Sequence, residues 1–376
     1  MLTIEQLTER INDRGVKINA EELNAEITML EKAIHMSSTY LIVKVSQVLG
    51  ISVSKVKLNS AKTMVDFFYG YHELPVTRLT TVGKTPALDS DTLMPFAETN
   101  ADVKCYIQYR SDSKNLHILK NLQKEIVYGD EIHTNFNCNG AISGRFTSQA
   151  PNLQQIPSSY RKLFIPRKGF KFLCIDLKQA EPQLSYALAG VEVPEDIHSK
   201  VAEQLGISRD KAKVFNIGVS YGMTAQGLAR VLNCSKQRAQ SLINTWRASN
   251  VELVEYINKI NTESADNGFV RIYDNTIAVR DSFKKSADSD WQSNRAFNIH
   301  VQGSLAKLIK IAMVNIQEFL DNYSPNSHIV LTEHDELVIE LADSAIQYTK
   351  KIVSMFENID GFSFKSKYII SDCWEK

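Results

Sequence analysis

The segment from Ile329 to Leu341 places three carboxylates and an imidazole between two apolar runs. Short apolar runs on both sides of a polar break predict two buried strands joined by a tight turn. In such a turn Glu333, Asp335 and Glu336 repel one another unless a cation is close, so the pattern suits a metal site. A solvated hairpin tip has the same pattern, and this segment alone leaves both interpretations open.

A second acidic position closes the apolar run from Phe170 to Asp176, and Glu181 follows five residues later. If the two acidic strands are neighbours, Asp176 and Asp335 can bridge two metal ions about 3.5–4 Å apart, one activating an attacking oxygen and one stabilising a leaving oxygen. Many strands end in aspartate, so the two positions are weak support without a third feature.

The third feature is a helix predicted from Arg209 to Gly222. One face of it is formed by residues that recur every four positions: Arg209, Lys213, Ile217 and Tyr221. Two cations followed by an apolar side chain and an aromatic ring fit a nucleoside triphosphate, whose phosphates would meet the cations. A surface helix with an apolar flank has the same spacing.

The chain has 376 residues, of which 43% are apolar and 23% charged, with 43 basic and 43 acidic side chains. A net charge of zero argues mildly against a nucleic-acid partner, because such proteins are usually basic. Between Gly140 and Lys178, however, basic residues outnumber the single acid Asp176: Arg145, Arg161, Lys162, Arg167, Lys168, Lys171 and Lys178. This excess predicts either a phosphate-binding patch or a solvated basic surface.

Five scattered cysteines without C-x-x-C or Cys/His ligand spacing predict free thiols in a reducing compartment. No apolar run approaches the length of a membrane span, and the N-terminus lacks the features of a signal peptide. We therefore expect a cytoplasmic protein with no membrane partner.

Hydrophobic periodicity predicts a mostly helical first part, with helices over residues 3–12, 20–49, 61–69 and 100–126. Strands are expected within 133–148 and at 170–176, 329–341 and 364–371, with a hairpin at 270–280. Helices are expected between these strands, over 196–265, 295–320 and 344–356. Strands on both sides of a helical insertion predict an α+β core interrupted by a helical subdomain.

Five motifs follow one another in the chain: S-G-R-F-T-S-Q-A-P-N-L-Q-Q-I-P (143–157), F-L-C-I-D-L-K-Q-A-E-P-Q-L (172–184), R-x3-K-x7-Y-G-M-T-A-Q-G-L-A (209–229), N-I-H-V-Q-G-S-L-A (298–306) and T-E-H-D-E-L-V (332–338). With them the chain resembles the polymerase domain of family A DNA polymerases, the DNA polymerase I type. The resemblance implies an α+β right-hand fold with an antiparallel-sheet palm, helical fingers and a helical thumb. It assigns the thumb to residues 1–132, the palm to 133–183 and 298–376, and the fingers to 184–297.

The motif positions imply a role for each candidate residue. Two Mg²⁺ ions, replaceable by Mn²⁺, would be held by Asp176, the Leu177 carbonyl and Asp335, with Glu336 as a supporting catalytic acid. The nucleotide would meet the phosphate-binding cations Arg209 and Lys213, of which Lys213 is also the candidate general acid, and further Glu181 as the sugar gate, Gln179, Ile217 and Tyr221. The residues expected near the primer terminus are Arg145, Asn298, Gln302 and His334.

Several positions depart from the family pattern. Ile217 stands where the family has Phe or Tyr, and Lys178, Pro182 and Gln183 replace serine, leucine and arginine. A short stretch between Asp176 and Arg209 implies trimmed fingers. No acidic exonuclease motif precedes the thumb, so neither proofreading nor 5′-nuclease activity is expected in this chain. The Met1 start suits a compact enzyme of phage or plasmid origin or a shortened one.

The expected activity is template-directed addition of dNMPs to a primer 3′-hydroxyl, with primer-template DNA and dNTPs as partners and replisome or processivity factors left open. A single-subunit RNA polymerase would share the two aspartates and the Lys/Tyr helix, but Glu181 and the His-Asp-Glu order favour DNA. A non-catalytic DNA-binding replication factor on a decayed polymerase fold is the alternative from another class. The retained acids, cations and tyrosine argue against it.

Overall fold

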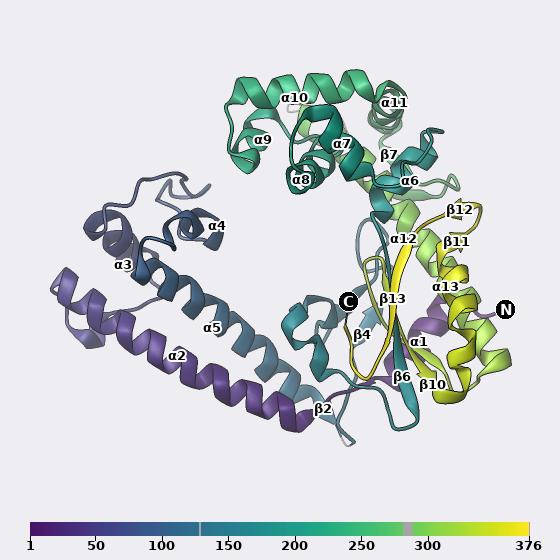
Figure 1. Cartoon of the computed structure of the whole chain (residues 1–376), viewed down its shortest axis with the longest axis horizontal. Coiled ribbons are helices and arrows are strands. Elements are labelled where there is room, and N and C mark those ends of the chain that lie inside the picture. Colours follow the sequence, from purple (N-terminus) through teal and green to yellow (C-terminus); the bar gives the residue numbers. More distant parts are fainter. Residues whose placement is uncertain (128, 281–288, 376) are drawn as a thin grey trace. The chain divides into compact units, whose positions relative to one another are not determined.

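The computed structural model describes residues 1–127, 129–280 and 289–375, without the side chains of 277–280 and 289–294 (Figure 1). Its contacts divide it into two compact units. One is formed by Met1–Lys17 together with His133–Lys376, and the other by Ile18–Ile132. All candidate site residues lie in the first unit.

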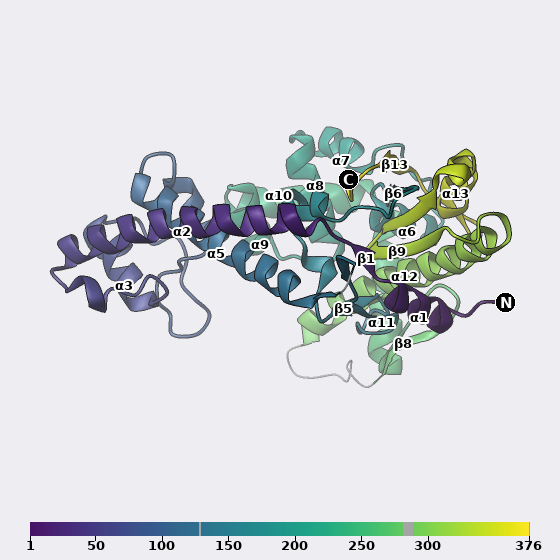
Figure 2. The same ribbon diagram turned by 90° about the horizontal axis from the view of Figure 1, so that it is seen from below.

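The smaller unit is mostly helical, and its two long helices α2 (Ala20–Leu49) and α5 (Ala101–Glu125) run side by side (Figures 1 and 2). Side chains of Asn19 and Asn100 accept hydrogen bonds from the first backbone amides of these helices, which fixes where each begins. The shorter elements are η1 (Val53–Lys55), α3 (Ala61–Val65), the π-helix η2 (Asp66–Tyr71), α4 (Ser90–Leu93), η3 (Met94–Phe96) and the hairpin of β2 (Ile126–Val127) and β3 (Glu131–Ile132).

The larger unit contains a four-stranded antiparallel sheet in the order β13–β6–β10–β9. Its strands are β6 (Phe170–Leu177), β9 (His328–Glu333), β10 (Glu336–Ala342) and β13 (Ser366–Ser371). The two central strands are buried along most of their length, as their apolar sequences require. Helices α12 (Ser289–Tyr323) and α13 (Thr349–Glu357) pack against the sheet. The strands and the hairpin predicted from the sequence are confirmed.

Smaller elements surround this sheet: α1 (Ile4–Arg14), β1 (Val16–Lys17), β4 (Asn135–Asn137), β5 (Thr147–Gln149), η4 (Leu153–Gln155), η5 (Ser158–Leu163), η6 (Asp343–Tyr348), β11 (Asn358–Ile359) and β12 (Phe362–Ser363). Helix α1 belongs to the larger unit because Arg10 pairs with Asp321 at 2.7 Å and Arg14 with buried Glu340 at 2.5 Å. The sequence-based boundary placed residues 1–132 in one domain. The structure differs, because the first 17 residues join the sheet unit.

The helical insertion consists of α6 (Ala180–Leu188), α7 (Ile197–Leu205), α8 (Arg209–Ser220), α9 (Ala225–Leu232), α10 (Lys236–Ser249) and α11 (Val251–Asn267), followed by the hairpin β7 (Phe269–Arg271) and β8 (Ile277–Arg280). Its core includes the fully buried rings of Phe215 and Trp246. The Trp246 indole donates to the Asn216 amide oxygen at 3.1 Å, so the inner face of α8 is fixed and its cationic face points elsewhere. No helix among the described residues is both long and apolar enough to cross a membrane.

Candidate active site

The two acidic strand ends are neighbours. Strand β10 pairs antiparallel with β6 so that Glu336 lies opposite Asp176, and the Leu177 amide donates to the Asp335 carbonyl at 3.2 Å. The tight turn after β9, in which His334 has a left-handed φ of 55°, therefore holds Asp335 beside the end of β6. The condition that the sequence left open, adjacency of the two strands, is met.

One cavity of about 680 Å³ gathers most of the candidate residues. The sheet contributes Asp176, Leu177 and Asp335 to its wall. The α8 face contributes the four residues predicted to share it, Arg209, Lys213, Ile217 and Tyr221, and the remaining predicted members are Gln179, Glu181 and Gln302. Acids that suit a cation and cations that suit a phosphate thus line a single space.

The Arg209 guanidinium is held by a residue that the sequence analysis missed. Its Nε donates to the Asp196 carboxylate at 2.8 Å, and this ion pair holds the pKa of Asp196 well below its usual range. The Gln179 amide donates to the other Asp196 oxygen at 3.0 Å. Gln179 was expected to bind substrate, and its amide here positions Asp196 and, through it, Arg209. Arg209 keeps its terminal nitrogens for an anion.

His198 is a second residue that the sequence analysis missed. It is buried in the cavity wall, and its Nδ1 has no hydrogen-bond partner among the described residues. Burial lowers the pKa of its imidazole, so the ring is neutral near pH 7. The sequence signal that could have identified it is the segment Asp196-Ile-His198. Asp196 caps the start of α7, which places His198 in the first turn of a helix that packs against α8.

Glu181 links two other candidates. Its carboxylate accepts hydrogen bonds from the Arg145 guanidinium and from the Tyr221 hydroxyl. Burial, reinforced by the nearby Glu181 charge, raises the pKa of Tyr221 well above its usual value, so its hydroxyl stays a donor. The Tyr221 ring also lies 6.4 Å from the buried ring of Phe297 on α12. These contacts hold the C-terminal end of α8 against α6 and α12.

The acids on the sheet side of the turn have a different environment from the one expected. Glu336 is buried, accepts from Arg161 at 2.8 Å and from the Trp374 indole at 2.6 Å, and does not line the 680 Å³ cavity. Its carboxylate is thus held by two donors outside the cavity, and its supporting catalytic role stays a prediction. Glu333, which a solvated hairpin tip would leave in water, is only 13% exposed and pairs with the same Arg161. The interpretation as a solvated tip is therefore wrong at Glu333, because Arg161 pairs with both acids.

The charge of the predicted basic patch is partly compensated by ion pairs. Four of its members form ion pairs with acids from elsewhere in the unit: Arg145 with Glu181, Arg161 with Glu333 and Glu336, Arg167 with Glu340, and Lys171 with Asp372. The local excess of charge in the sequence is therefore compensated by residues that are distant in the chain. These four residues are therefore not an unpaired excess of positive charge.

Four predicted residues lie outside the cavity lining: Arg145 and Glu336, described above, and Asn298 and His334. His334 is exposed at the hairpin turn, and Asn298 lies on α12 with its amide oxygen buried and without a hydrogen-bond partner among the described residues. Gln302, one helical turn beyond Asn298, does line the cavity. The structure therefore brings one of these three polar residues to the site directly.

The cavity suits a divalent cation by the chemistry of its oxygen donors. Asp176, Asp335 and the Leu177 carbonyl supply hard oxygen ligands, and Mg²⁺ usually binds through one or two carboxylates and completes its coordination with water and substrate phosphates. No group of three or more His, Cys, Asp or Glu side chains able to hold a metal occurs in the described parts of the chain. The arrangement therefore fits an ion shared with a phosphate ligand.

Comparison with known families gives a match over residues 21–365 to the model described as DNA polymerase family A. The chain belongs to DNA polymerase family A. The resemblance drawn from the five motifs is thereby confirmed. So is the α+β right-hand fold, since the polymerase domain of Pol1 from M. smegmatis, solved in complex with DNA primer-template and dNTP, superimposes with a TM-score of 0.86. That similarity is at 21% identity and covers 99% of this chain and 69% of the solved one.

Curated relatives named DNA polymerase I show the same relationship. The Caldicellulosiruptor bescii protein is 29% identical over 82% of this chain, the Pseudomonas aeruginosa protein 28% over 77%, and the Borreliella burgdorferi protein 30% over 79%. The matched region spans 39%, 35% and 35% of these relatives, respectively. The chain thus corresponds to well under half the length of each.

Proposed function

We propose that the protein is a template-directed DNA polymerase that adds dNMPs to a primer 3′-hydroxyl. The observation that carries this proposal is the single cavity that joins Asp176 and Asp335 to the cationic face of α8. Phosphoryl transfer needs positioning and charge neutralisation more than a protein nucleophile, and this cavity offers both. Family membership and the solved complex with primer-template and dNTP support the same choice of substrates.

Asp176, Asp335 and the Leu177 carbonyl would hold two Mg²⁺ ions, with Mn²⁺ as a substitute. When bound, such ions make the attacking hydroxyl more acidic and offset the charge that develops on the phosphoryl oxygens. The protein's own contribution is to fix the two carboxylates on adjacent strands, where the Leu177 amide and the Asp335 carbonyl are hydrogen-bonded.

The outer phosphates would meet Arg209, Lys213 and His198. Arg209 is oriented by Asp196, Lys213 lies one helical turn further along the same face, and the neutral His198 ring can donate a hydrogen bond. Lys213 is also the candidate proton donor to departing pyrophosphate, because it is the lysine by which the α8 face lines the cavity.

Sugar and base would contact the far end of the α8 face. Glu181 and Tyr221 are joined by a hydrogen bond, which would keep the carboxylate beside the sugar. Ile217 offers an aliphatic surface where a ring would stack, which predicts weaker sugar contact. Near the primer terminus the proposed residues are Arg145, Gln302, Asn298 and His334.

In the same proposal the unit Ile18–Ile132 serves as thumb, the sheet as palm and α6–α11 as fingers. The five cysteines carry no disulfide, which supports an intracellular location. Binding of replisome or processivity factors and the lack of proofreading in this chain stay predictions.

The proposal is tested by primer extension on a primed DNA template with Mg²⁺, comparing dNTPs with NTPs. We expect extension with dNTPs and little with NTPs, because Glu181 lines the cavity and would, as the proposed sugar gate, exclude a ribose 2′-hydroxyl. Extension with NTPs would favour an RNA polymerase. No extension with either would favour a non-catalytic DNA-binding protein.

A further inference from the structure

Lys367 lies directly opposite Asp176. The register of β13 on β6 pairs the two residues, and residues opposite each other on antiparallel strands project from the same face with Cβ atoms about 4.5–5.5 Å apart. On the other side of Asp176 stands Glu336, and beyond it Glu333. One row of four charged side chains therefore crosses the sheet, with a single cation at its outer edge.

Lys367 and Arg161, the two cations beside this row, differ in their contacts. Arg161 binds Glu336 and Glu333 and stacks on the Trp374 ring at 4.4 Å, so its charge is committed to those two acids. The Lys367 side chain is exposed on the edge strand and makes no hydrogen bond or ion pair within the described residues. Its ammonium is therefore available to whatever occupies the space beside Asp176.

Lys367 lines the 680 Å³ cavity together with Arg209 and Lys213. It also borders a second cavity of about 410 Å³, which Asp176 lines as well. A long flexible side chain at this position can turn toward Asp176 or toward a phosphate in the larger cavity. Cations thus approach the same space from both the α8 face and the sheet edge.

We propose that Lys367 makes divalent-ion binding at Asp176 depend on the nucleotide, disfavouring a free ion and favouring an ion that arrives with a triphosphate. The inference rests on the proposed function. A fixed positive charge beside Asp176 repels a free divalent cation, whereas a metal–triphosphate complex is a net anion and is attracted. Lys367 would then be a specificity-determining residue contributed by the sheet edge, distinct from the phosphate-binding face of α8.

The test is the variant Lys367→Gln, which keeps the length and polarity of the side chain but removes its charge. Mn²⁺ binding to the protein without nucleotide, followed by electron paramagnetic resonance, should tighten about threefold to tenfold. Binding of dNTP to the protein–primer–template complex in Ca²⁺, followed by fluorescence titration, should weaken by a similar factor. Lys367→Arg should resemble the unchanged protein in both measurements.

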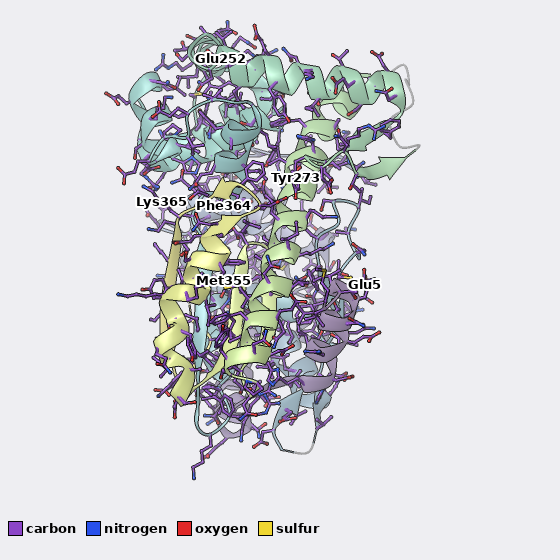
Figure 3. The ribbon with its side chains drawn as sticks, turned by 90° about the vertical axis from the view of Figure 1, so that its right-hand side faces the viewer. Glu5, Glu252, Tyr273, Met355, Phe364 and Lys365 are labelled. Atoms are coloured by element: carbon purple, nitrogen blue, oxygen red, sulfur yellow. The ribbon has the colours of Figure 1, made fainter. Side chains whose placement is uncertain are left out.

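Lys365→Gln is the matched control. Lys365 lies two residues earlier, beside Phe364 where the chain enters β13 (Figure 3), and its ammonium pairs with exposed Glu195 at 2.9 Å outside the cavity. This variant should alter neither binding constant. Thermal unfolding of each variant checks that the fold is kept.

Opposite shifts of the two binding constants in Lys367→Gln support the proposal, because loss of structure would weaken both. Any other combination, including an unchanged Mn²⁺ affinity, overturns it. Asp176→Asn separates this inference from the proposed function. If Asp176→Asn leaves Mn²⁺ binding unchanged, the metal assignment itself fails; if it weakens binding while Lys367→Gln has no effect, only the role of Lys367 fails.

Discussion

Asp335 and Glu336 are adjacent in the chain, yet their carboxylates have different tasks because of where the turn ends. Asp335 lies in the turn and lines the cavity, whereas Glu336 begins β10 and is buried against Arg161 and Trp374. A buried carboxylate needs hydrogen-bond partners, and these two donors supply them. Glu336 therefore holds the hairpin in place through Arg161 and Trp374, whereas Asp335 lines the cavity.

Replacing Glu336 by alanine should lower the free energy of unfolding by about 3–5 kcal/mol, because it removes the buried carboxylate that accepts from both the Arg161 guanidinium and the Trp374 indole. Urea unfolding followed by circular dichroism measures this. The control is Glu195→Gln, whose exposed ion pair with Lys365 is screened by solvent and should leave the unfolding free energy almost unchanged. Equal effects of the two substitutions would mean that the Arg161 cluster does not hold the turn.

For single helices and strands, the sequence pattern predicts the structure correctly where the spacing of apolar and polar residues determines it. The four-residue spacing on α8 correctly predicted a face shared by Arg209, Lys213, Ile217 and Tyr221, and the polar break correctly predicted the β9–β10 hairpin. Pattern fails where a partner comes from a distant element. The pairing of Arg161 with Glu333 crosses 172 residues of chain, and no local rule could select it over solvent.

The same limit explains the residues that were missed. Asp196 was recognisable as the start of a helix, but its contact with Arg209 depends on how α7 packs against α8. Lys367 faces Asp176 only through the register of the last strand on β6. Register depends on which face of a strand is buried. It can be predicted only when the neighbouring strand is known.

Strand β9 carries a pH-sensitive contact. His328 lies opposite Glu340, and burial, together with the nearby charges of Arg14 and Arg10, lowers the pKa of its imidazole to about 4, although Asp321 and Glu340 oppose this. Its unfolded value is about 6.5. The unfolded chain therefore binds more protons between these values, so stability is lost as the pH falls from about 6.5 toward 4.

The variant His328→Gln should escape this loss. The difference in unfolding free energy between the original protein and the variant should fall by about 1–2 kcal/mol from pH 7 to pH 4.5, a figure reduced for partial exposure. Urea unfolding at both pH values measures it. A difference that does not depend on pH would show that His328 titrates normally in the folded state.

The whole molecule consists of two units with separate cores. The unit Ile18–Ile132 encloses its own apolar cluster, which includes the fully buried Phe67, Phe68 and Leu93. Its boundary with the sheet unit was missed at the N-terminal side, because α1 has the same helical period as the helices that follow. Long-range contacts, among them the ion pairs of Arg10 and Arg14 and the hydrogen bonds between Asn12 and Phe136, assign that helix to the sheet unit.

A fragment of residues 18–132 should therefore fold alone. We expect a helical circular-dichroism spectrum and a single cooperative thermal transition, because the buried cluster lies wholly inside the fragment. The comparison is a fragment of residues 18–88, which keeps α2 but lacks its partner α5 and should melt without cooperativity. Similar melting of the two fragments would contradict the division into units.

The central claim is that Asp176 and Asp335 together form the metal-dependent centre of nucleotide addition. It is tested most directly by single-turnover dNMP incorporation in Mg²⁺ by Asp335→Asn and, as its neighbour in the same turn, Glu336→Gln. The account predicts that Asp335→Asn lowers the rate by about 1,000-fold or more with primer-template binding retained, and that Glu336→Gln lowers it far less. Normal incorporation by Asp335→Asn would contradict the account.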